Sequence, residues 1–564
     1  MLSRYRVDVT PGEWRWVTFT GVGLILFAFI PFFLVALTGA SSQEGQFMGV
    51  FNNHIDGATY LSKMLQGQNG HWLIRFQHTS EDFSPAMIQL LYAFLGQIAG
   101  ITNIPTIPLF HVARVIASMF MYMAIYYLGA TVWMRVRTRK IFFLLTALGG
   151  GFGWLLALLT ENTNFPDLSI PEAFPLYSSF VNVHFPLAIA ALALLAGLII
   201  RMFRPGSSTS PKVDNGGSSA VVLSVSLAIL YPQAIVPLTL GLGIYLAIYL
   251  YNQRFASDEE NGRQYGNGQD SDNTQKDQKL RLAVLRTAKW LALIVLPASP
   301  FAVYYAAVVR YNAAFSEWNS QNITLAPSPV VFVLGFGFPL LLALPGIYRA
   351  VRQFEPDGDQ FMLLWLAAIL IAVYAPTNIQ RRFSIGIMLP VAYFATRAIE
   401  DFWFQYWSRR WRFRAFAAVL AFSSLSFLLV LFVPILPALT GNPQQSEGVF
   451  LERDYTTAFQ WLENRAQSTD VVLASPKVSI WLPAWAGTRV VYGHPFETLE
   501  ADAKKEAVIN WYQDESAENC NTLLDNEHVR FVIAGPREDE LGVTGCLDSL
   551  QLIAQFGRVF LYAV

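Results

Sequence analysis

The chain has 564 residues, of which 54% are hydrophobic and 14% are charged, and its mean hydropathy is +0.37. Soluble domains carry about 25% charged residues, so this composition argues against a soluble protein and indicates a polytopic membrane protein. A formal net charge of −1 argues against nucleic acid as a partner, because neutralising phosphates needs a clustered basic excess.

The N-terminal region predicts a retained membrane anchor. Arg4, Arg6 and Arg15 precede an apolar run at 16–37, and no small-residue cleavage site follows it. Ten further apolar runs follow along the chain: 110–133, 141–159, 185–202, 220–230, 234–251, 283–309, 330–347, 361–374, 385–395 and 416–436. Hydropathy therefore predicts an α-helical polytopic membrane protein with about eleven transmembrane helices.

One more apolar stretch, at 84–101, decides the topology of everything that follows it. If it crosses the membrane, the basic cluster at 135–140 lies outside, against the positive-inside rule. We therefore expect an interfacial helix on the outer surface. The N-terminus and the other basic clusters are then cytoplasmic, and an odd number of spans places the C-terminus outside the cytoplasmic membrane.

A change of pattern predicts two domains, a transmembrane domain over 1–440 with a first outer loop at 38–108, and a small extracytoplasmic α/β domain over 441–564. In the second domain, strand-length apolar runs alternate with helix-like stretches; the runs are 471–474, 490–492 and 530–534, and the helices 455–464 and 501–512. The polar insertion at 252–279 predicts a linker.

Both cysteines, Cys520 and Cys546, fall in the predicted C-terminal domain. An extracytoplasmic location permits a disulfide bond between them, and two buried free thiols are the alternative. Neither belongs to a Cys-x-x-Cys motif, so a redox or zinc role has little support.

Acids gather in the predicted outer loops. Asp56 lies in the stretch 54–60, shortly after the first span, and acids at a membrane are costly enough to suggest a use. The loop between the third and fourth spans adds Asp167, Glu172 and His184. These positions suggest catalysis at the outer membrane surface.

Arg381 and Arg382 are outer arginines that the positive-inside rule leaves unexplained. Phosphate binding is one explanation, and pairing with phospholipid headgroups is the other. An acid beside paired arginines fits the transfer of a sugar from a polyprenyl phosphate. The acid deprotonates an acceptor hydroxyl, while the guanidinium groups hold the phosphate as the glycosidic bond breaks.

About the first 130 residues resemble the GT-C glycosyltransferases, integral membrane enzymes that include protein mannosyltransferases and the lipid A aminoarabinose transferase. The resemblance is carried by the following residues: Asp56, Tyr60, Gly70-His71-Trp72, Pro85, Leu90-Leu91-Tyr92, Gly96 and Ala113-Arg114. The doubled proline of many members is Ser84-Pro85 here, and a doubled acid after the first span is absent. No Trp-Trp-Asp-Tyr-Gly run exists, so an oligosaccharyltransferase is not expected.

The resemblance implies that Asp56 is the catalytic base and that a second acid from the next outer loop, Asp167 or Glu172, accompanies it. Helix capping is the alternative use of Asp56. Ordinary turns next to proline are the alternative for Asp167 and Glu172, and the sequence does not choose between these two acids.

Five more side chains are candidates for the substrate groove: His54, Tyr60, His184, Tyr231 and Gln233. Tyr60 shares a helical face with the first-loop acid, or else anchors the chain at the interface. The two histidines bind substrate or a metal, or make local hydrogen bonds. The run 231–233 forms a tight outer hairpin, with or without substrate contact.

Metal dependence stays open. His71, His78, Glu81 and Asp82 offer ligands for a divalent metal, but they lack the spacing of a recognisable zinc site. In the C-terminal domain, the runs 481–485 and 492–494 suit a sugar-contacting loop or the aromatic packing of a small core, and core packing is favoured.

We expect an inverting GT-C-like glycosyltransferase of the cell envelope. It moves a hexosyl or pentosyl group from a polyprenyl-phosphate donor to a lipid, glycan or protein acceptor. The alternative is a transporter or flippase of lipid-linked sugars, against which the lack of repeated halves speaks. A non-catalytic envelope assembly protein, the third possibility, needs no acid at position 56.

Overall fold

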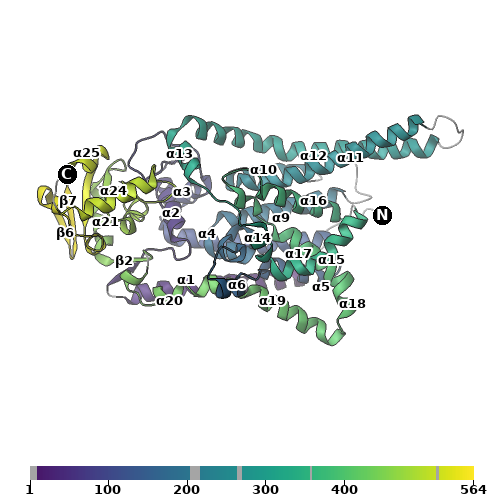
Figure 1. Cartoon of the computed structure of the whole chain (residues 1–564), viewed down its shortest axis with the longest axis horizontal. Helices are drawn as coiled ribbons and strands as arrows, with labels where there is room; N and C mark the ends of the chain where they lie inside the picture. Colours follow the sequence, from purple (N-terminus) through teal and green to yellow (C-terminus); the bar gives the residue numbers. More distant parts are fainter. Residues whose placement is uncertain are drawn as a thin grey trace. The chain divides into compact units, whose positions relative to one another are not determined.

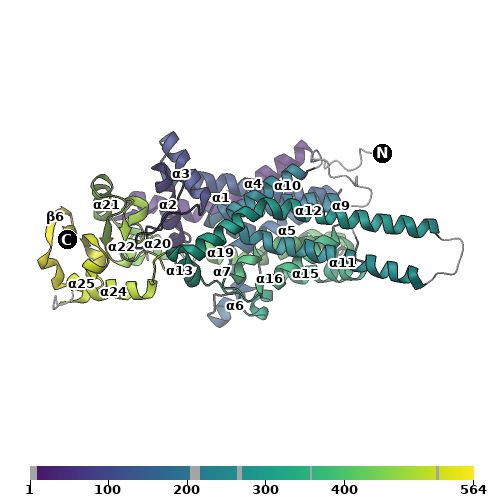
Figure 2. The same ribbon diagram turned by 90° about the horizontal axis from the view of Figure 1, so that it is seen from above.

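The computed structural model describes residues 9–42, 44–203, 216–262, 270–355, 358–446, 448–515 and 520–564. It is mostly helical (Figures 1 and 2). Seven of the described helical segments are long and apolar enough to cross a membrane: Pro11–Ser41, Thr106–Val132, Val136–Thr160, His184–Arg201, Val284–Tyr311, Gln380–Tyr406 and Arg409–Ala438. The protein is a multi-pass membrane protein.

Each of the eleven apolar runs predicted as a span lies in helical chain. Those outside the seven long segments fall on α10 (Gly217–Leu230), the first part of α11 (Ile235–Gly262), α14 with α15 (Pro329–Leu334, Gly337–Gln353) and α16 (Asp359–Val373). Their apolar stretches are shorter than those of the long segments. The helical membrane fold is thus confirmed, and the count of eleven crossings stays a prediction.

The prediction of a linker at 252–279 was wrong for the part that the structure describes. Helix α11 continues to Gly262, and α12 (Asp270–Tyr311) begins at Asp270. Extending an existing helix fixes one residue for each hydrogen bond gained, so a polar sequence continues a helix that an apolar segment has nucleated.

The chain divides into two compact units. Unit 1 takes in the described residues within 9–26, 115–303 and 324–430, and unit 2 takes in those within 27–114, 304–323 and 431–564. Unit 2 thus combines the predicted first outer loop with the C-terminal segment. The domain boundary after residue 440 stays a prediction.

Unit 1 is helical, and its helices pack closely. Helix α15 packs on α17, and α11 packs on α16. At Gly346 of α15, an added Cβ would lie 2.4 Å from the carbonyl oxygen of Phe394, so only glycine permits this approach. Its remaining helices, of which α1, α4 and α19 belong to it only in part, are α1 (Pro11–Ser41), α4 (Thr106–Val132), α5 (Val136–Leu148), α6 (Gly153–Thr160), α7 (Pro166–Ser169), η2 (Pro171–Ala173), α8 (Pro175–Val181), α9 (His184–Phe203), η4 (Pro232–Ala234), η5 (Gln380–Ser384), α17 (Met388–Ala398), η6 (Ile399–Trp403), α18 (Phe404–Tyr406) and α19 (Arg409–Phe432).

Unit 2 is built around α2 (His54–Gln68), which packs on α3 (Leu90–Thr102). The two helices touch through Gly67 and Gly96, where an added Cβ would lie 2.3 Å from the oxygen of Ala93 and 2.1 Å from that of Met64, respectively. Its other helices are α13 (Ala313–Gln321), α20 (Ile435–Ala438), η7 (Pro443–Gln445), α21 (Arg453–Arg465), α22 (Pro476–Ser479), α23 (Leu482–Trp485), α24 (Ala501–Gln513), α25 (Cys520–Asn526), α26 (Pro536–Asp539) and η8 (Gly545–Ser549).

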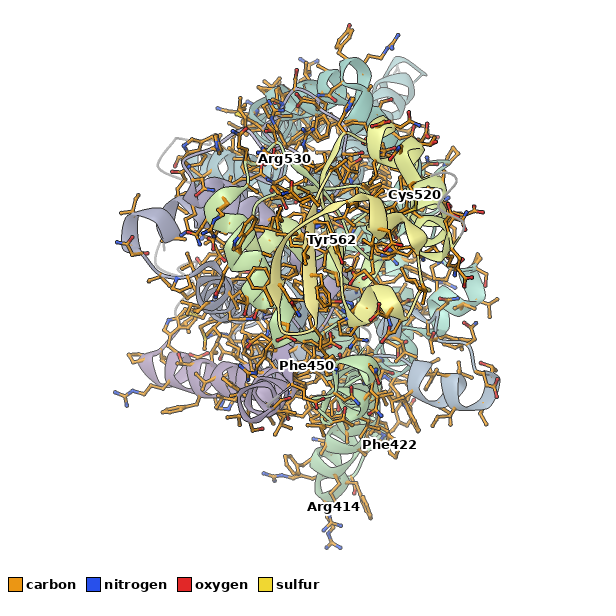
Figure 3. The ribbon with its side chains drawn as sticks, turned by 90° about the vertical axis from the view of Figure 1, so that its left-hand side faces the viewer. Arg414, Phe422, Phe450, Cys520, Arg530 and Tyr562 are labelled. Atoms are coloured by element: carbon orange, nitrogen blue, oxygen red, sulfur yellow. A yellow bond between two sulfur atoms is a disulfide. The ribbon has the colours of Figure 1, made fainter. Side chains whose placement is uncertain are left out.

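The strands of unit 2 form two sheets. Strand β1 (Gly45–Phe47) pairs antiparallel with β2 (Phe450–Glu452), which joins the first loop to the C-terminal segment. The second sheet has the order β4-β3-β5-β7-β6. Its strands are β3 (Val471–Leu473), β4 (Arg489–Val490), β5 (Val529–Ala534), β6 (Gln551–Phe556) and β7 (Val559–Ala563). Figure 3 looks onto this sheet, with Arg530 of β5 and Tyr562 of β7 labelled.

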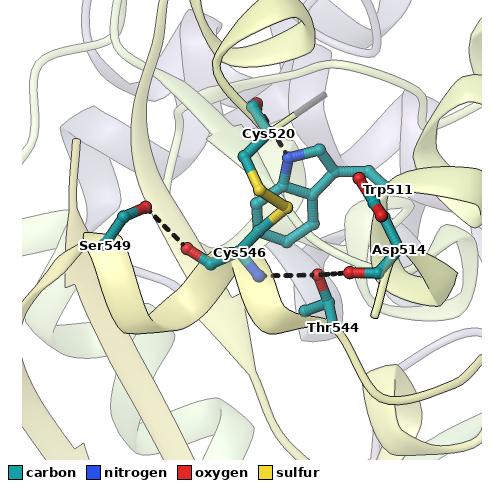
Figure 4. The surroundings of a disulfide bond; sticks show 6 residues. All are labelled: Trp511, Asp514, Cys520, Thr544, Cys546 and Ser549. Carbon is teal, nitrogen blue, oxygen red and sulfur yellow. Dashed lines mark hydrogen bonds between the residues drawn. A yellow bond between two sulfur atoms is a disulfide. The ribbon is translucent and has the colours of Figure 1, made fainter. Parts of the chain in front are cut away.

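The mixed sheet and its helices confirm the α/β character of the C-terminal segment. Strand β3 pairs in parallel with β4 and β5, whereas β7 pairs antiparallel with β5 and β6. Cys520 and Cys546, predicted to pair, form a disulfide bond with a Cα–Cα distance of 5.3 Å (Figure 4). Trp511 Nε1 donates a hydrogen bond to the carbonyl oxygen of Cys520 at 3.1 Å. The disulfide bond therefore lies next to the buried side chain of Trp511.

Candidate active site

Asp56 lies in the first turn of α2. The helix begins after Asn53, whose left-handed backbone (φ 53°) occupies the capping position, so Asp56 is not the cap. Instead, the Asn53 side-chain amide donates a hydrogen bond to Asp56 Oδ2 at 2.7 Å. The carboxylate side chain is 40% exposed, and its charge is favourable near the positive end of the helix dipole.

His494 holds the other carboxylate oxygen of Asp56. His494 is 3% exposed, and its Nε2 lies 3.2 Å from Asp56 Oδ1. Its Nδ1 accepts hydrogen bonds from the backbone N–H groups of Phe496 at 3.0 Å and Glu497 at 3.2 Å. Because Nδ1 accepts, the ring proton lies on Nε2, and a neutral His494 donates it to Asp56.

These contacts keep Asp56 ionised. Desolvation works to raise the pKa of the Asp56 carboxyl, but the hydrogen bonds from His494 and Asn53 outweigh it, so the pKa is lowered from its usual value. Near neutral pH, the site therefore presents a partly exposed carboxylate in a fixed orientation, which can accept a proton from a bound hydroxyl group.

A buried ion pair anchors the loop that carries His494. Lys63, on α2, lies 2.5 Å from Glu497, and their side chains are 1% and 5% exposed. Desolvation opposes the charge of Glu497, but Lys63 and the nearby His78 hold the pKa of its carboxyl far below the usual range. His78 donates from Nε2 to the oxygen of Ile480 at 3.0 Å. Lys63 and Glu497 thus fix the 494–497 loop onto α2.

Two predicted groove residues of unit 2 are in ring contacts. The His54 ring lies 6.4 Å from that of Trp481, in a stacked arrangement. Tyr60 is buried and stacks on Tyr92 of α3, with ring centroids 4.3 Å apart. Tyr60 thus supports the packing of α2 on α3.

Unit 1 gathers six of the predicted site residues near one another. Glu172 of η2 is 3% exposed, and its carbonyl oxygen accepts a hydrogen bond from Gly386 N, just after η5, at 3.2 Å. Glu172, Arg381 and Arg382 all act electrostatically on the Tyr231 hydroxyl. The His184 ring stacks on Tyr231 with centroids 6.2 Å apart. Gln233 follows in η4, which packs on η5.

Asp167 has a different environment from Glu172. It is fully buried, and its Oδ2 accepts hydrogen bonds from Gly151 N at 2.9 Å, Gly153 N at 3.0 Å and the Ser426 hydroxyl at 2.5 Å. The carboxylate therefore caps the chain where α5 breaks and α6 begins. Burial raises the pKa of Asp167 to about 6.

Three of the four residues named as possible metal ligands, His78, Glu81 and Asp82, have other partners in unit 2. Glu81 pairs with Lys504 at 2.5 Å, and Asp82 pairs with Arg75. Among the described residues, one group of three potential ligands lies close together, Asp514 with Cys520 and Cys546. Both of these cysteines are in the disulfide and offer no thiolate.

The fold is similar to that of ArnT from Cupriavidus metallidurans in the apo state. The likeness covers 96% of this chain and 97% of ArnT, with 10% sequence identity and a TM-score of 0.50. The chain has a GT-C-like fold. The expected resemblance to GT-C glycosyltransferases is thus confirmed in the fold, and at this identity the likeness concerns the fold alone.

Two other proteins are similar to this GT-C-like chain with lower scores. The Archaeoglobus fulgidus oligosaccharyltransferase, tethered with an acceptor peptide, matches 92% of this chain and 69% of its own at 13% identity and a TM-score of 0.47. The arabinofuranosyltransferase AftD from Mycobacteria matches 97% of this chain and 41% of its own, at 12% identity and a TM-score of 0.47. No protein-family model and no curated protein matches the sequence.

Three site residues of the GT-C-like chain were not predicted. His494 lies in the run 492–494, for which core packing was favoured; Tyr492 does join the core, but His494 turns to Asp56. Lys63 and Glu497 carry no sequence signal beyond their charge.

Proposed function

We propose that this protein is a glycosyltransferase that moves one sugar from a polyprenyl-phosphate donor to an acceptor hydroxyl outside the cytoplasmic membrane. The observation that carries the proposal is the ionised, half-exposed Asp56 carboxylate, oriented by His494 and Asn53. A lipid, a glycan or a protein supplies the acceptor hydroxyl. The GT-C-like fold supports this reaction class by analogy.

Asp56 acts as the general base. Its carboxylate takes the proton of the acceptor hydroxyl while the hydroxyl oxygen bonds to the anomeric carbon of the sugar. The bond from that carbon to the phosphate oxygen breaks, and polyprenyl phosphate leaves with the bonding electron pair. One displacement at the anomeric carbon inverts its configuration. General-base catalysis of this kind contributes roughly 10²–10⁴-fold in rate.

Arg381 and Arg382 hold the donor phosphate in this proposal. Arg381 Nε is buried and has no hydrogen-bond partner among the described residues, which leaves a donor for a ligand. Guanidinium groups suit phosphate oxygens, whose charge grows as the glycosidic bond breaks. His184, Tyr231 and Gln233, gathered in the same unit, are then the groove residues around the phosphate.

Glu172 is the better second-acid candidate. Asp167 uses one oxygen for three hydrogen bonds at the break between α5 and α6, which accounts for its presence structurally. Glu172 instead shares its surroundings with Arg381 and Arg382. We assign it the role of setting the charge and position of the arginines.

One contact supports the proposed sidedness of the site. His494 touches Asp56, so the first loop and the C-terminal segment lie on one side of the membrane. An even number of crossings must then separate them, and six of the seven long apolar segments lie between them. The ten crossings predicted there are also an even number. The disulfide supports an oxidising, extracytoplasmic location for this side, with a cytoplasmic N-terminus.

The proposal is tested with the full-length protein in liposomes. Polyprenyl phosphates carrying isotope-labelled mannose, arabinofuranose or aminoarabinose are supplied, and mass spectrometry follows the release of polyprenyl phosphate and the label on the acceptor. We expect release that depends on the protein and a product of inverted anomeric configuration. Movement of intact donor between leaflets without release would assign the flippase function instead.

A further inference from the structure

A concave site lies within unit 2, at the far end of α2 from Asp56. It is a cavity of about 550 Å³, a size typical of ligand sites. Leu65 in the last turn of α2 and Asn69, which caps the helix, line part of it. Thirteen residues separate Asn69 from Asp56, which at the α-helical rise is about 20 Å. The cavity is therefore distinct from the proposed catalytic carboxylate.

Three aromatic side chains line the cavity, and one of them, Trp72, is accessible. Trp72 lines the cavity and is 48% exposed, although tryptophan side chains are on average highly buried. Phe83 and the buried Phe76 line the cavity as well. The indole face of Trp72 provides a flat apolar surface next to polar side chains, so it suits a ligand that is apolar on one face and polar at its edges.

The polar part of the cavity lining consists of planar charged side chains, both positive and negative. Arg489 donates hydrogen bonds to the backbone oxygens of Thr469 at 3.0 Å and Ser80 at 2.8 Å, which fix its guanidinium group. Arg75 pairs with Asp82, and their side chains remain 43% and 68% exposed. These forked groups present paired donors and acceptors of the kind that adjacent hydroxyl groups match.

The charges and the backbone pairing around the cavity argue against a phosphate, a lipid chain or an extended peptide as its ligand. Arg75 is neutralised by Asp82, and Arg489 donates to backbone oxygens, so the described residues of the lining hold no unopposed cluster of cations for a phosphate. The charged rim disfavours a lipid chain. An extended peptide needs an open strand edge, but Ile74 in this region is already paired with Ala86 through two backbone hydrogen bonds of 2.9 and 3.0 Å.

We propose that this cavity is a saccharide-binding site that takes a neutral oligosaccharide, with a sugar ring stacked on Trp72 and its hydroxyl groups bonded to Arg75 and Asp82. Sugar rings combine an apolar C–H face with adjacent hydroxyls, which matches the aromatic and the charged side chains of the lining. Because the cavity lies far along α2 from Asp56, it holds a glycan chain rather than the sugar in transfer.

The test is saturation-transfer NMR on the full-length protein in lipid nanodiscs, since maltoside detergents carry competing sugars. The probes are mannotriose, chitotriose, maltotriose and arabinotriose, with inorganic phosphate and an uncharged extended peptide as competitors. We expect saturable binding of at least one trisaccharide. Trp72→Ala should weaken it about ten-fold, the size expected for one lost aromatic contact, whereas Trp72→Phe should retain most of the affinity.

Controls separate this site from the catalytic proposal. Arg75→Gln should weaken binding, while Arg465→Gln, at an exposed arginine of α21, should not. Asp56→Asn should bind the trisaccharide as the wild type does, whatever its effect on transfer. No saturable binding of any trisaccharide, binding that Trp72→Ala leaves unchanged, or displacement by phosphate or the peptide would overturn the assignment.

Discussion

Nε2 of His494 lies 3.2 Å from Oδ1 of Asp56, and only one direction of hydrogen bonding is open to this pair. Two backbone N–H groups occupy Nδ1, so the histidine donates and the carboxylate accepts. His494 therefore acts on Asp56 as a positioning residue, and its loss should change the ionisation of the carboxylate.

Replacing His494 with alanine should shift the pH dependence of transfer. The hydrogen bond from His494 lowers the pKa of Asp56, so its removal raises that pKa. Because the proposed base acts when ionised, the acid limb of the kcat/KM profile should move to higher pH. The control His528→Asn, at an exposed histidine, should leave the profile in place. An unmoved acid limb in His494→Ala would contradict the role of His494.

Replacing Lys63 with methionine should destabilise unit 2. The change leaves the Glu497 carboxylate buried without its cation, and breaking such a pair costs about 3–5 kcal/mol. Lys477→Met, which breaks an exposed pair with Glu540, should cost less than about 1 kcal/mol. Denaturant unfolding in nanodiscs compares the two variants, and equal losses would argue against a structural role for the buried pair.

The pair of Lys63 and Glu497 should make the stability of the protein fall at acidic pH. The pKa of Glu497 is lowered by folding, so its contribution to stability is present above the ordinary carboxyl pKa and is lost as the pH falls. Unfolding measured from neutral to acidic pH should show this loss in the wild type. In Lys63→Met the loss should be smaller, because the ion pair is already gone.

Replacing Arg381 or Arg382 with glutamine should weaken use of the donor. A charge-assisted hydrogen bond is worth about 1.5–3 kcal/mol, so kcat/KM for the polyprenyl-phosphate donor should fall roughly ten- to hundred-fold. Arg352→Gln, at an exposed arginine of α15, is the matched control and should be neutral. Wild-type donor kinetics in both variants would remove the arginines from the proposed phosphate site.

Reducing the disulfide should destabilise the C-terminal segment. The bond between Cys520 and Cys546 closes a loop with a sequence separation of 26, for which chain-entropy arguments give about 3 kcal/mol. Thermal unfolding with and without reductant measures the effect. The Cys520→Ser/Cys546→Ser variant should start destabilised and show no response to reductant; a response there would point to another cause.

The helices and the C-terminal strands were predictable because local pattern determines them. Apolar runs of spanning length mark the membrane helices, and β3, β4 and β5 coincide with short apolar runs. The hairpin of β6 and β7 was not predicted, although β7 is an apolar run of strand length. The break after α5 depends on Asp167, from another segment, and so has no local signature.

The candidate site was predictable only in part. Asp56 and the loop acids stood out because charge near a membrane is costly. The partner of Asp56 comes from more than 400 residues away (sequence separation 438), and such long-range pairing leaves no mark in a single sequence. Lys63 likewise shows its role only through Glu497, which a distant loop brings to it.

The most direct test of the account is the transfer activity of Asp56→Asn in proteoliposomes, with release of polyprenyl phosphate as the readout. Asparagine keeps the size of the side chain but cannot take the proton, so the account predicts a loss of roughly 10²–10⁴-fold with unchanged unfolding. Asp525→Asn, at an exposed acid of α25, should retain full activity. Wild-type release by Asp56→Asn would contradict the assignment of Asp56 as the base.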